Sequence, residues 1–359
     1  MTISEGFAQA AIAGAKPWTD PSSGNLRWDY RDGDEIDHQV WCLDAVAGAD
    51  ALAVLAARGL DRTALWRAGG EDPSWWDVLA TDDPGSRARA LTTIAVHDTP
   101  VTRGAGDVVV RRVAAQTGTR VVTLDDDGYV VRAEVTVPPA PTVVERLGDD
   151  EGNGVVLTFD DGPDAEWTPA VLDVLAEFDA PAAFFVVGVA ASDEPELVRE
   201  VVDAGHIVAS HSWHHPDMAQ LEPDEVRVQL ERTARLLESL VGHEIRLYRA
   251  PYTAMLDTSS AQALAVHKPV FDAGYAYVGA SVDPADWSGR DAETIADEIL
   301  AQVEAGGRVV VLHDGGGDRS ATVAALRTVI PELRRRGHPI VGLDHYLGRS
   351  RAELTPALS

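Results

Sequence analysis

Apolar and polar positions follow two alternating patterns in the part of the chain after Gly154. Apolar residues recur at helical spacing in several segments, as in Leu197, Val198, Val201 and Val202. Short apolar runs between these segments predict buried strands at 155–159, 182–187, 207–210, 245–248, 277–281, 309–312 and 340–341. Repeated strand–helix units predict a parallel sheet, and about seven of them predict an irregular (β/α)7 barrel of the α/β class.

The residues before Gly154 have shorter β-branched runs that are separated by turn signals. They predict a strand or two over 25–41, a helix over 43–58 and a small antiparallel meander over 107–137. Prolines at 138–141 and an acidic run at 148–154 predict a boundary. We therefore expect a smaller N-terminal α+β part. We divide the chain into an N-terminal segment (1–100), a meander with linker (101–150), a main domain (151–349) and a C-terminal tail (350–359).

Charge and composition narrow the classes of partner. Acidic residues outnumber basic ones 58 to 30, so the formal net charge is −28. A surface this negative repels phosphate backbones and anionic lipid, and we expect no nucleic-acid partner. No apolar stretch approaches the roughly 20 residues that cross a bilayer, and no signal peptide is visible. As written, the chain is expected in the cytoplasm or as an extracytoplasmic piece of a longer bacterial protein.

Polar clusters follow five of the predicted strands, where the loops of a parallel barrel converge. In chain order they are TFDDGP (158–163), HSWHHP (211–216), RAPY (249–252), DPADW (283–287) and LHD (312–314). The adjacent carboxylates of the first cluster allow one to bind a cation while the other handles a proton. The His-x3-His spacing of the second lets two imidazoles reach one ion, which with a carboxylate makes a three-ligand site with positions left for water.

These five clusters, in this order and spacing, resemble the motifs of the NodB-homology polysaccharide deacetylases, carbohydrate esterase family four. The resemblance covers about residues 151–347. It implies an acetylated glycan partner and removal of acetyl from the acetamido groups of an N-acetylhexosamine polymer or oligomer. It also implies one divalent metal ion, zinc in the first place, with cobalt, manganese and nickel as alternatives.

The resemblance assigns roles to residues at the metal. It implies that the ligands are Asp161, His211 and His215. Asp160 is then the general base on the metal-bound water, and Arg249 pairs with that base. An amide is a poor electrophile with a poor leaving group, so hydrolysis needs acidified water, a polarised carbonyl and a proton donor.

The remaining roles concern the substrate and the proton donor. By the same resemblance, His313 protonates the leaving amine and Asp286 orients His313. The backbone N–H of Tyr252 helps to hold the oxyanion, and Trp287 lines the substrate groove. Val311 stands where the family usually has leucine, which slightly enlarges the pocket expected for the acetyl methyl group.

A second resemblance covers part of the first 100 residues. The segments 28–30, 38–45, 64–67 and 71–73 are similar to the closing strands of a glycoside hydrolase family eighteen barrel. In multidomain bacterial proteins such a barrel precedes a deacetylase domain. The acidic D-x-x-D-x-D-x-E signature is absent from this chain, so we expect no glycosidase activity.

Two other functions stay open on the sequence alone. One is a deacylase or amidohydrolase that acts on a small cyclic amide, and the other is a non-catalytic glycan-binding module. All five motifs are intact, which argues against a pure binder because a binder need not keep His313. An open groove would favour a polymer, whereas a closed pocket would favour a small molecule.

Overall fold

The computed structural model describes residues 6–7, 9–10, 13–20, 25–31, 36–42, 44–59, 74–80, 89–96, 99–126, 130–148, 152–253 and 255–358. The chain divides into two compact units. Unit 1 comprises Met1–Thr102, Val113–Val143 and Ser259–Ala261. Unit 2 comprises Arg103–Arg112, Val144–Thr258 and Gln262–Ser359.

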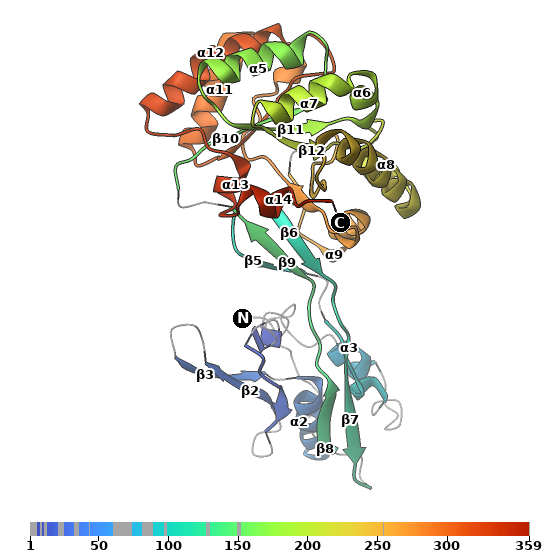
Figure 1. Ribbon diagram of the computed structural model, residues 1–359. Helices are drawn as coiled ribbons and strands as arrows, with labels where there is room; N and C mark the ends of the chain where they lie inside the picture. The colour runs from blue at the N-terminus through green and yellow to red at the C-terminus, as the bar shows by residue number, and fades with distance from the viewer. Residues whose placement is uncertain are drawn as a thin grey trace. The chain divides into compact units, whose positions relative to one another are not determined.

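Unit 1 contains two three-stranded antiparallel sheets (Figure 1). Their orders are β1-β2-β3 and β4-β7-β8. Trp28 is fully buried in the first sheet and stacks on Phe7 with ring centroids 5.7 Å apart. The elements of this unit are β1 (Trp18–Thr19), β2 (Leu26–Arg31), β3 (Asp37–Cys42), α2 (Ala45–Ala57), α3 (Ser74–Leu79), β4 (Thr93–Ile94), β7 (Gly118–Leu124) and β8 (Val130–Val137).

The N-terminal part differs from the sequence expectation in the strands over 107–137. The runs expected as one meander over 107–137 belong to two sheets, because β6 (Val108–Val113) joins the sheet of unit 2 while β7 pairs with β8. Val108 and Val109 are fully buried, so β6 gains an apolar environment that a small meander would not provide. The strands β2 and β3 pair antiparallel, in agreement with the strands expected over 25–41. The segments 64–67 and 71–73 of the second resemblance lie outside the described residues.

Unit 2 is built on a nine-stranded sheet in the order β15-β10-β11-β12-β13-β14-β6-β9-β5. Pairings from β15 to β14 are parallel, and β6 is antiparallel to β14. Just after β14, Val282 forms a parallel bridge with Val310, which closes the parallel strands into a ring. The remaining strands are β5 (Val101–Arg103), β9 (Val143–Leu147), β10 (Val156–Asp160), β11 (Ala182–Val186), β12 (Ile207–Ser210), β13 (Leu247–Tyr248), β14 (Ala276–Val278) and β15 (Val309–His313).

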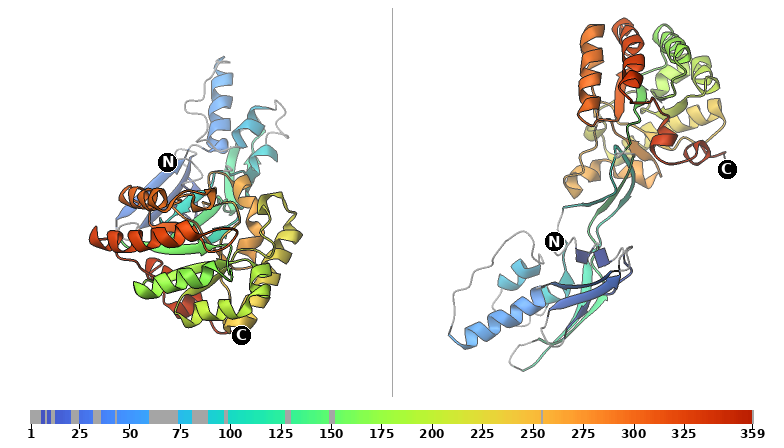
Figure 2. Two further views of the ribbon diagram at one scale, coloured as in Figure 1. Left: turned by 90° about the horizontal axis from the view of Figure 1, so that it is seen from above. Right: turned by 90° about the vertical axis from the view of Figure 1, so that its left-hand side faces the viewer.

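Helices cover the outside of this ring (Figures 1 and 2). The longest, α8, begins at Pro223 with a capping box between Glu222 and Glu225. It ends at Val241 and is capped by Gly242, whose φ of 75° suits glycine. No helix among the described residues combines the length and the apolar character of a membrane span. The helices are α5 (Trp167–Glu177), α6 (Gly188–Asp193), α7 (Pro195–Asp203), α8 (Pro223–Val241), α9 (Ala261–Val266), α10 (Lys268–Asp272), α11 (Ala292–Glu304), α12 (Ser320–Arg335), α13 (Leu343–Tyr346) and α14 (Arg351–Leu354), with 3-10 turns at Met218–Gln220 and Asp286–Ser288.

The α/β class is confirmed, but the expected seventh strand is shorter than predicted. In place of a strand at 340–341, Ile340 forms a single parallel bridge with Val155. Gly342 then starts α13, whose Leu343 and Tyr346 pack into the apolar interior of the ring. The chain at this point therefore plugs one end of the ring instead of extending its sheet.

The pleat of the parallel strands decides which side chains enter the ring, because successive residues point to opposite faces. On β10, Val156 packs inside the ring while Leu157 and Phe159 pack against the helices. Thr158 and Asp160 follow Val156 at steps of two residues, so they lie on the same inner face of the ring. The interior is thus apolar near α13 and becomes polar at the carboxyl ends of the strands, where the candidate chemistry lies.

Candidate active site

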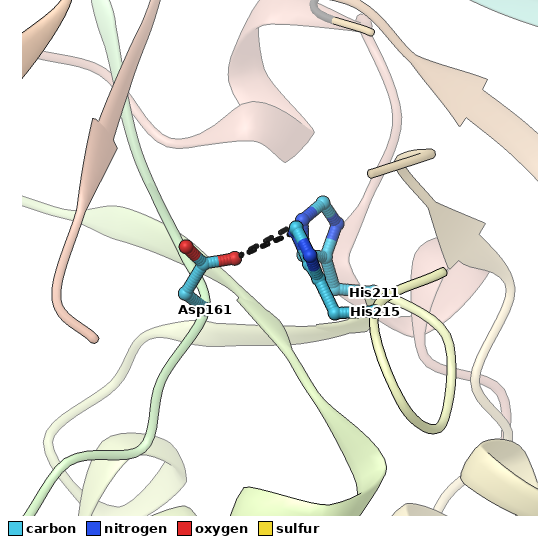
Figure 3. Close-up of side chains that lie close together, drawn as sticks. All are labelled: Asp161, His211 and His215. Atoms are coloured by element: carbon cyan, nitrogen blue, oxygen red, sulfur yellow. Dashed lines mark ion pairs between the residues drawn. The ribbon is translucent and has the colours of Figure 1, made fainter. Parts of the chain in front are cut away.

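Three side chains that could hold a metal ion converge at the carboxyl ends of β10 and β12 (Figure 3). They are Asp161, His211 and His215, and one possible ligand atom from each lies within 4.8 Å of the others. The Nε2 atoms of His211 and His215 lie 3.5 and 3.0 Å from Asp161 Oδ1. This is the set that the sequence predicted.

The polar atoms of this set are arranged for a cation. His211 Nδ1 lies 2.9 Å from the carbonyl oxygen of Arg249, which can only accept, so the proton is on Nδ1 and the lone pair of Nε2 is available. Asp161 Oδ1 is buried and makes no hydrogen bond to any described residue. Burial raises the pKa of Asp161, but the imidazoles of His211 and His215 lower it more, which holds it well below its usual range. An anionic oxygen and imidazole nitrogens match the ligands that zinc prefers.

Backbone strain collects around these residues. Asp161, Ser212, His215, Tyr252 and Ala285 have φ values between 53° and 76°, in the left-handed region that non-glycine residues seldom adopt. Each such residue costs on the order of 1–3 kcal/mol. The surrounding core holds them in place, and for Asp161 and His215 the conformation directs the side chain toward the shared centre.

The expected general base, Asp160, immediately precedes Asp161 and is buried in the interior. Its carboxylate accepts a hydrogen bond of 2.9 Å from Arg249 Nη1. Arg249 is fully buried and also donates to Thr158 Oγ1 and to the carbonyl oxygens of Val278 and Gly279. The guanidinium is therefore fixed by four contacts and holds the Asp160 carboxylate in one orientation.

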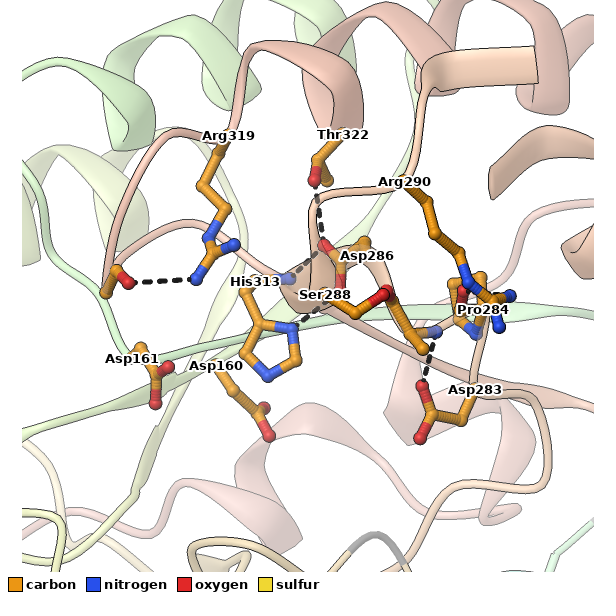
Figure 4. Close-up of polar contacts among 12 residues, drawn as sticks. Asp160, Asp161, Asp283, Pro284, Asp286, Ser288, Arg290, His313, Arg319 and Thr322 are labelled. Carbon is orange, nitrogen blue, oxygen red and sulfur yellow. Dashed lines mark hydrogen bonds and ion pairs between the residues drawn. The ribbon is translucent and has the colours of Figure 1, made fainter. Parts of the chain in front are cut away.

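The expected general acid, His313, lies beside Asp160 because β10 and β15 pair with these two residues in register. Its Nδ1 lies 2.7 Å from Asp286 Oδ1, and its backbone N–H donates to Asp286 Oδ2 (Figure 4). Thr322 Oγ1 also donates to Asp286 Oδ2 at 2.8 Å. Burial lowers the pKa of His313, but Asp286, with smaller contributions from Asp160 and Asp161, raises it more, so the net shift is upward. His313 also lines the cavity described next.

A cavity of about 480 Å³ brings the predicted site residues together. Nine of the ten line its wall, and Asp286 lies behind His313. Tyr252 and Trp287 are 75% and 59% exposed, whereas Val311 is buried in the interior. The cavity thus has exposed aromatic residues at its rim and a buried interior. The wall residues are Asp160, Asp161, His211, His215, Arg249, Ala250, Tyr252, Thr253, Asp283, Trp287, Val311, His313, Gly316 and Arg319.

Sequence reasoning left out two buried groups at this site. Asp314 follows His313. Its backbone N–H donates to the carbonyl oxygen of Asp160, and its carboxylate accepts a hydrogen bond from Thr168 Oγ1. Burial and the charges of Asp160 and Asp161 raise the pKa of Asp314 to about 7. Arg319 lies in the cavity wall after the glycine run 315–317, and that run was the signal that could have drawn attention to it.

Comparison with known proteins identifies the relatives of this chain. The family model described as polysaccharide deacetylase matches residues 148–268. A chitooligosaccharide deacetylase of Bradyrhizobium sp. (strain ANU 289) is 39% identical over 221 residues, which is 56% of this chain and 96% of the relative. A peptidoglycan-N-acetylglucosamine deacetylase of Bacillus cereus is 34% identical over 197 residues, which is 55% of this chain and 69% of the relative.

A solved structure agrees as well. The Bc1960 peptidoglycan N-acetylglucosamine deacetylase, in complex with an N-hydroxybenzamide derivative, superposes with a TM-score of 0.51 at 32% identity and covers 57% of this chain and 92% of that chain. Deacetylases of this family are metal-dependent, in keeping with the Asp161, His211 and His215 set. The chain therefore belongs to the polysaccharide deacetylase family, the NodB-homology enzymes of carbohydrate esterase family four, and is a hydrolase that acts on amide bonds.

Proposed function

We propose that this enzyme removes acetyl groups from an N-acetylglucosamine polymer or oligomer, with Asp160 as general base and His313 as general acid. One observation carries the proposal. Asp160 held by Arg249 and His313 held by Asp286 flank the same cavity that contains the Asp161, His211 and His215 set. A base and an acid with separate buried partners are what a hydrolysis that moves two protons requires.

Asp161, His211 and His215 would hold a divalent cation, which we propose to be zinc. When bound, such a cation acts as a Lewis acid that makes water acidic near neutral pH and polarises the acyl oxygen. The chain's own contribution is orientation. The Nδ1–H of His211 donates to the Arg249 carbonyl, which fixes the direction of Nε2. The backbone N–H of His215 donates to the Ser212 hydroxyl at 3.1 Å.

Asp160 accepts the proton of the attacking water while Arg249 keeps the carboxylate oriented. The backbone N–H of Tyr252 donates to the oxyanion that develops on the acyl oxygen. His313 then transfers the proton on Nε2 to the amine nitrogen as the carbon–nitrogen bond breaks. Asp286 accepts the hydrogen bond of Nδ1 and orients the His313 ring for the transfer.

The rim favours a glycan over a small cyclic amide. Trp287 is more than half exposed, and its indole offers an apolar face on which a sugar ring can stack. Val311 lines the buried interior, where we place the acetyl methyl group. The chitooligosaccharide and peptidoglycan-N-acetylglucosamine deacetylases similar to this chain are named for substrates that contain N-acetylglucosamine.

The direct test is release of acetate from a panel of substrates. We would incubate the full chain with chitooligosaccharides, peptidoglycan and a small cyclic amide, each with zinc, cobalt, manganese or nickel, and quantify acetate or the freed amine. Deacetylation of a glycan is expected, and the double variant Asp160→Asn, His313→Ala serves as the inactive control. Hydrolysis of the cyclic amide alone would contradict the proposal.

The pH profile of the reaction should depend on Asp286. In Asp286→Asn the carboxylate that raises the pKa of His313 is lost, so this pKa falls and less imidazolium is present at neutral pH. The basic limb of the kcat profile should then move to lower pH, by an amount read from steady-state rates between pH 5 and 10. Asp297→Asn, an exposed change on α11, is the matched control. An unchanged basic limb in Asp286→Asn would contradict the role of His313 as the acid.

We propose a division of the chain at about residue 151, with 151–349 as the catalytic domain and Ile340 marking the seventh element of an irregular (β/α)7 barrel. The likeness of the N-terminal segment to the end of a family eighteen glycosidase barrel stays a prediction. Expression of 151–359 alone, followed by acetate release, would test whether the catalytic domain needs the preceding residues for activity.

A further inference from the structure

Arg319 is a buried cation in the wall of the catalytic cavity, and none of the proposed steps uses it. It is the residue before α12 and is 6% exposed. Its Nε donates to the carbonyl of Gly315 at 2.7 Å, and its Nη2 donates to the carbonyl of Gly316 at 3.1 Å. Figure 4 shows the guanidinium pointing from α12 toward Asp161 and His313.

The two arginines of the cavity differ in their partners. Arg249 bonds the carboxylate of Asp160 and makes three further hydrogen bonds, so four of its five N–H groups have partners. Arg319 bonds two neutral carbonyls, which leaves three of its five N–H groups without a bond to a described residue. Its neighbour Asp318 is exposed, and the Asp318 carboxylate accepts from the N–H of Ser320 instead. Among the described residues no carboxylate is hydrogen-bonded to the Arg319 guanidinium, so its remaining N–H donors are available to an anionic ligand.

The glycine run before Arg319 brings the guanidinium close to the metal ligand. A Cβ on Gly316 would lie 2.9 Å from Asp161 Oδ2 and 3.4 Å from Arg319 Nη2, so roughly one methyl group would fill the gap between them. A Cβ on Gly315 would meet the Asp161 carbonyl oxygen at 2.5 Å. Only residues without side chains allow this approach. The Arg319 guanidinium therefore lies next to the place that the acyl group must occupy during the reaction.

We propose that Arg319 is a carboxylate-binding residue of the cavity and holds the acetate that the reaction releases. The inference rests on the proposed function. Hydrolysis adds the oxygen of water to the acyl carbon, breaks the carbon–nitrogen bond and yields an acetate anion and an ammonium group. The anion forms among the carboxylates of Asp160, Asp161 and Asp283, which repel it. A guanidinium offers paired N–H donors that match a carboxylate.

The experiment compares binding of acetate with binding of acetamide, which has a similar shape and no charge. Both are titrated into the zinc-loaded full chain by calorimetry, without turnover, for the native protein, Arg319→Gln and Arg319→Lys. Acetate should bind about 10-fold more weakly to Arg319→Gln, as expected for loss of a charge-assisted hydrogen bond, while acetamide affinity stays within about twofold. The acetate affinity of Arg319→Lys should lie between those of the native protein and Arg319→Gln. Arg319→Lys replaces Arg319→Gln if Arg319→Gln does not fold. Arg327→Gln, an exposed change on α12, should match the native protein.

The outcomes separate this inference from the proposed function. Equal loss of acetate and acetamide affinity would show a merely structural role, and unchanged acetate affinity would likewise overturn the proposal. Because binding is measured directly, the result stands even if no glycan is deacetylated. A second arm compares kcat/KM for a neutral N-acetylglucosamine oligomer and one with an adjacent carboxylate. A loss confined to the carboxylated oligomer, with acetate affinity unchanged, would assign Arg319 to a substrate carboxylate instead.

Discussion

Removal of divalent metal is expected to abolish amide hydrolysis while the fold of unit 2 persists. Without a cation, Asp161, His211 and His215 keep their places but supply no Lewis acid, and Asp160 alone is a weak base for bulk water. The loss of several kcal/mol of transition-state stabilisation corresponds to a fall in rate of about 10³-fold or more. Acetate release before chelation, after chelation and dialysis, and after return of zinc measures the effect.

The same samples provide the structural control. The core of unit 2 consists of apolar side chains between the sheet and its helices, so circular dichroism should be unchanged by chelation. The melting temperature should fall modestly, because a ligand that binds only the folded state stabilises it. Full activity in a sample shown by elemental analysis to be free of metal would refute the assignment of these three residues as a catalytic metal site.

The site could be predicted from the sequence to a large extent because each part is local. Asp160 and Asp161 are adjacent, and His211 and His215 lie on one short loop. The convergence of these loops then follows from the parallel sheet, since the carboxyl ends of its strands meet at one edge. Asp160 lies beside His313 because β10 and β15 pair in a register that matches these two residues. This register follows from the fold and could not be predicted from either motif.

Features that depend on distant packing were harder to predict. The run at 340–341 has the composition of a strand, yet the glycine after it and the apolar face of α13 turn the chain across the end of the ring. The run at 108–110 fits a meander equally well, and only the edge of β14 decides its pairing. Arg319 is an ordinary residue at the start of a helix until the glycine loop brings it beside Asp161.

Two histidine variants should fail in different ways. In His211→Ala the proposed ligand set falls from three residues to two, so both metal and activity should be lost. In His313→Ala the ligand set is intact, so zinc should stay near one equivalent while turnover falls by roughly 10²–10⁴-fold, the usual contribution of a positioned acid or base. Elemental analysis and acetate release on the same preparations measure the two effects. His214→Ala, beside the proposed ligands but with an exposed side chain, is the matched control for the loop.

The leaving group offers a sharper test of His313. The amine of an N-acetyl sugar must be protonated as it leaves, whereas an aryl acetate expels a phenolate that is stable without a proton. His313→Ala should therefore be impaired much less on the aryl ester than on the sugar, and His211→Ala should be inactive on both. If His313→Ala loses its metal, or is impaired equally on the two substrates, His313 is not the general acid. In that case Asp286 and Thr322, which fix its ring, would serve the structure of the cavity and not the proton transfer.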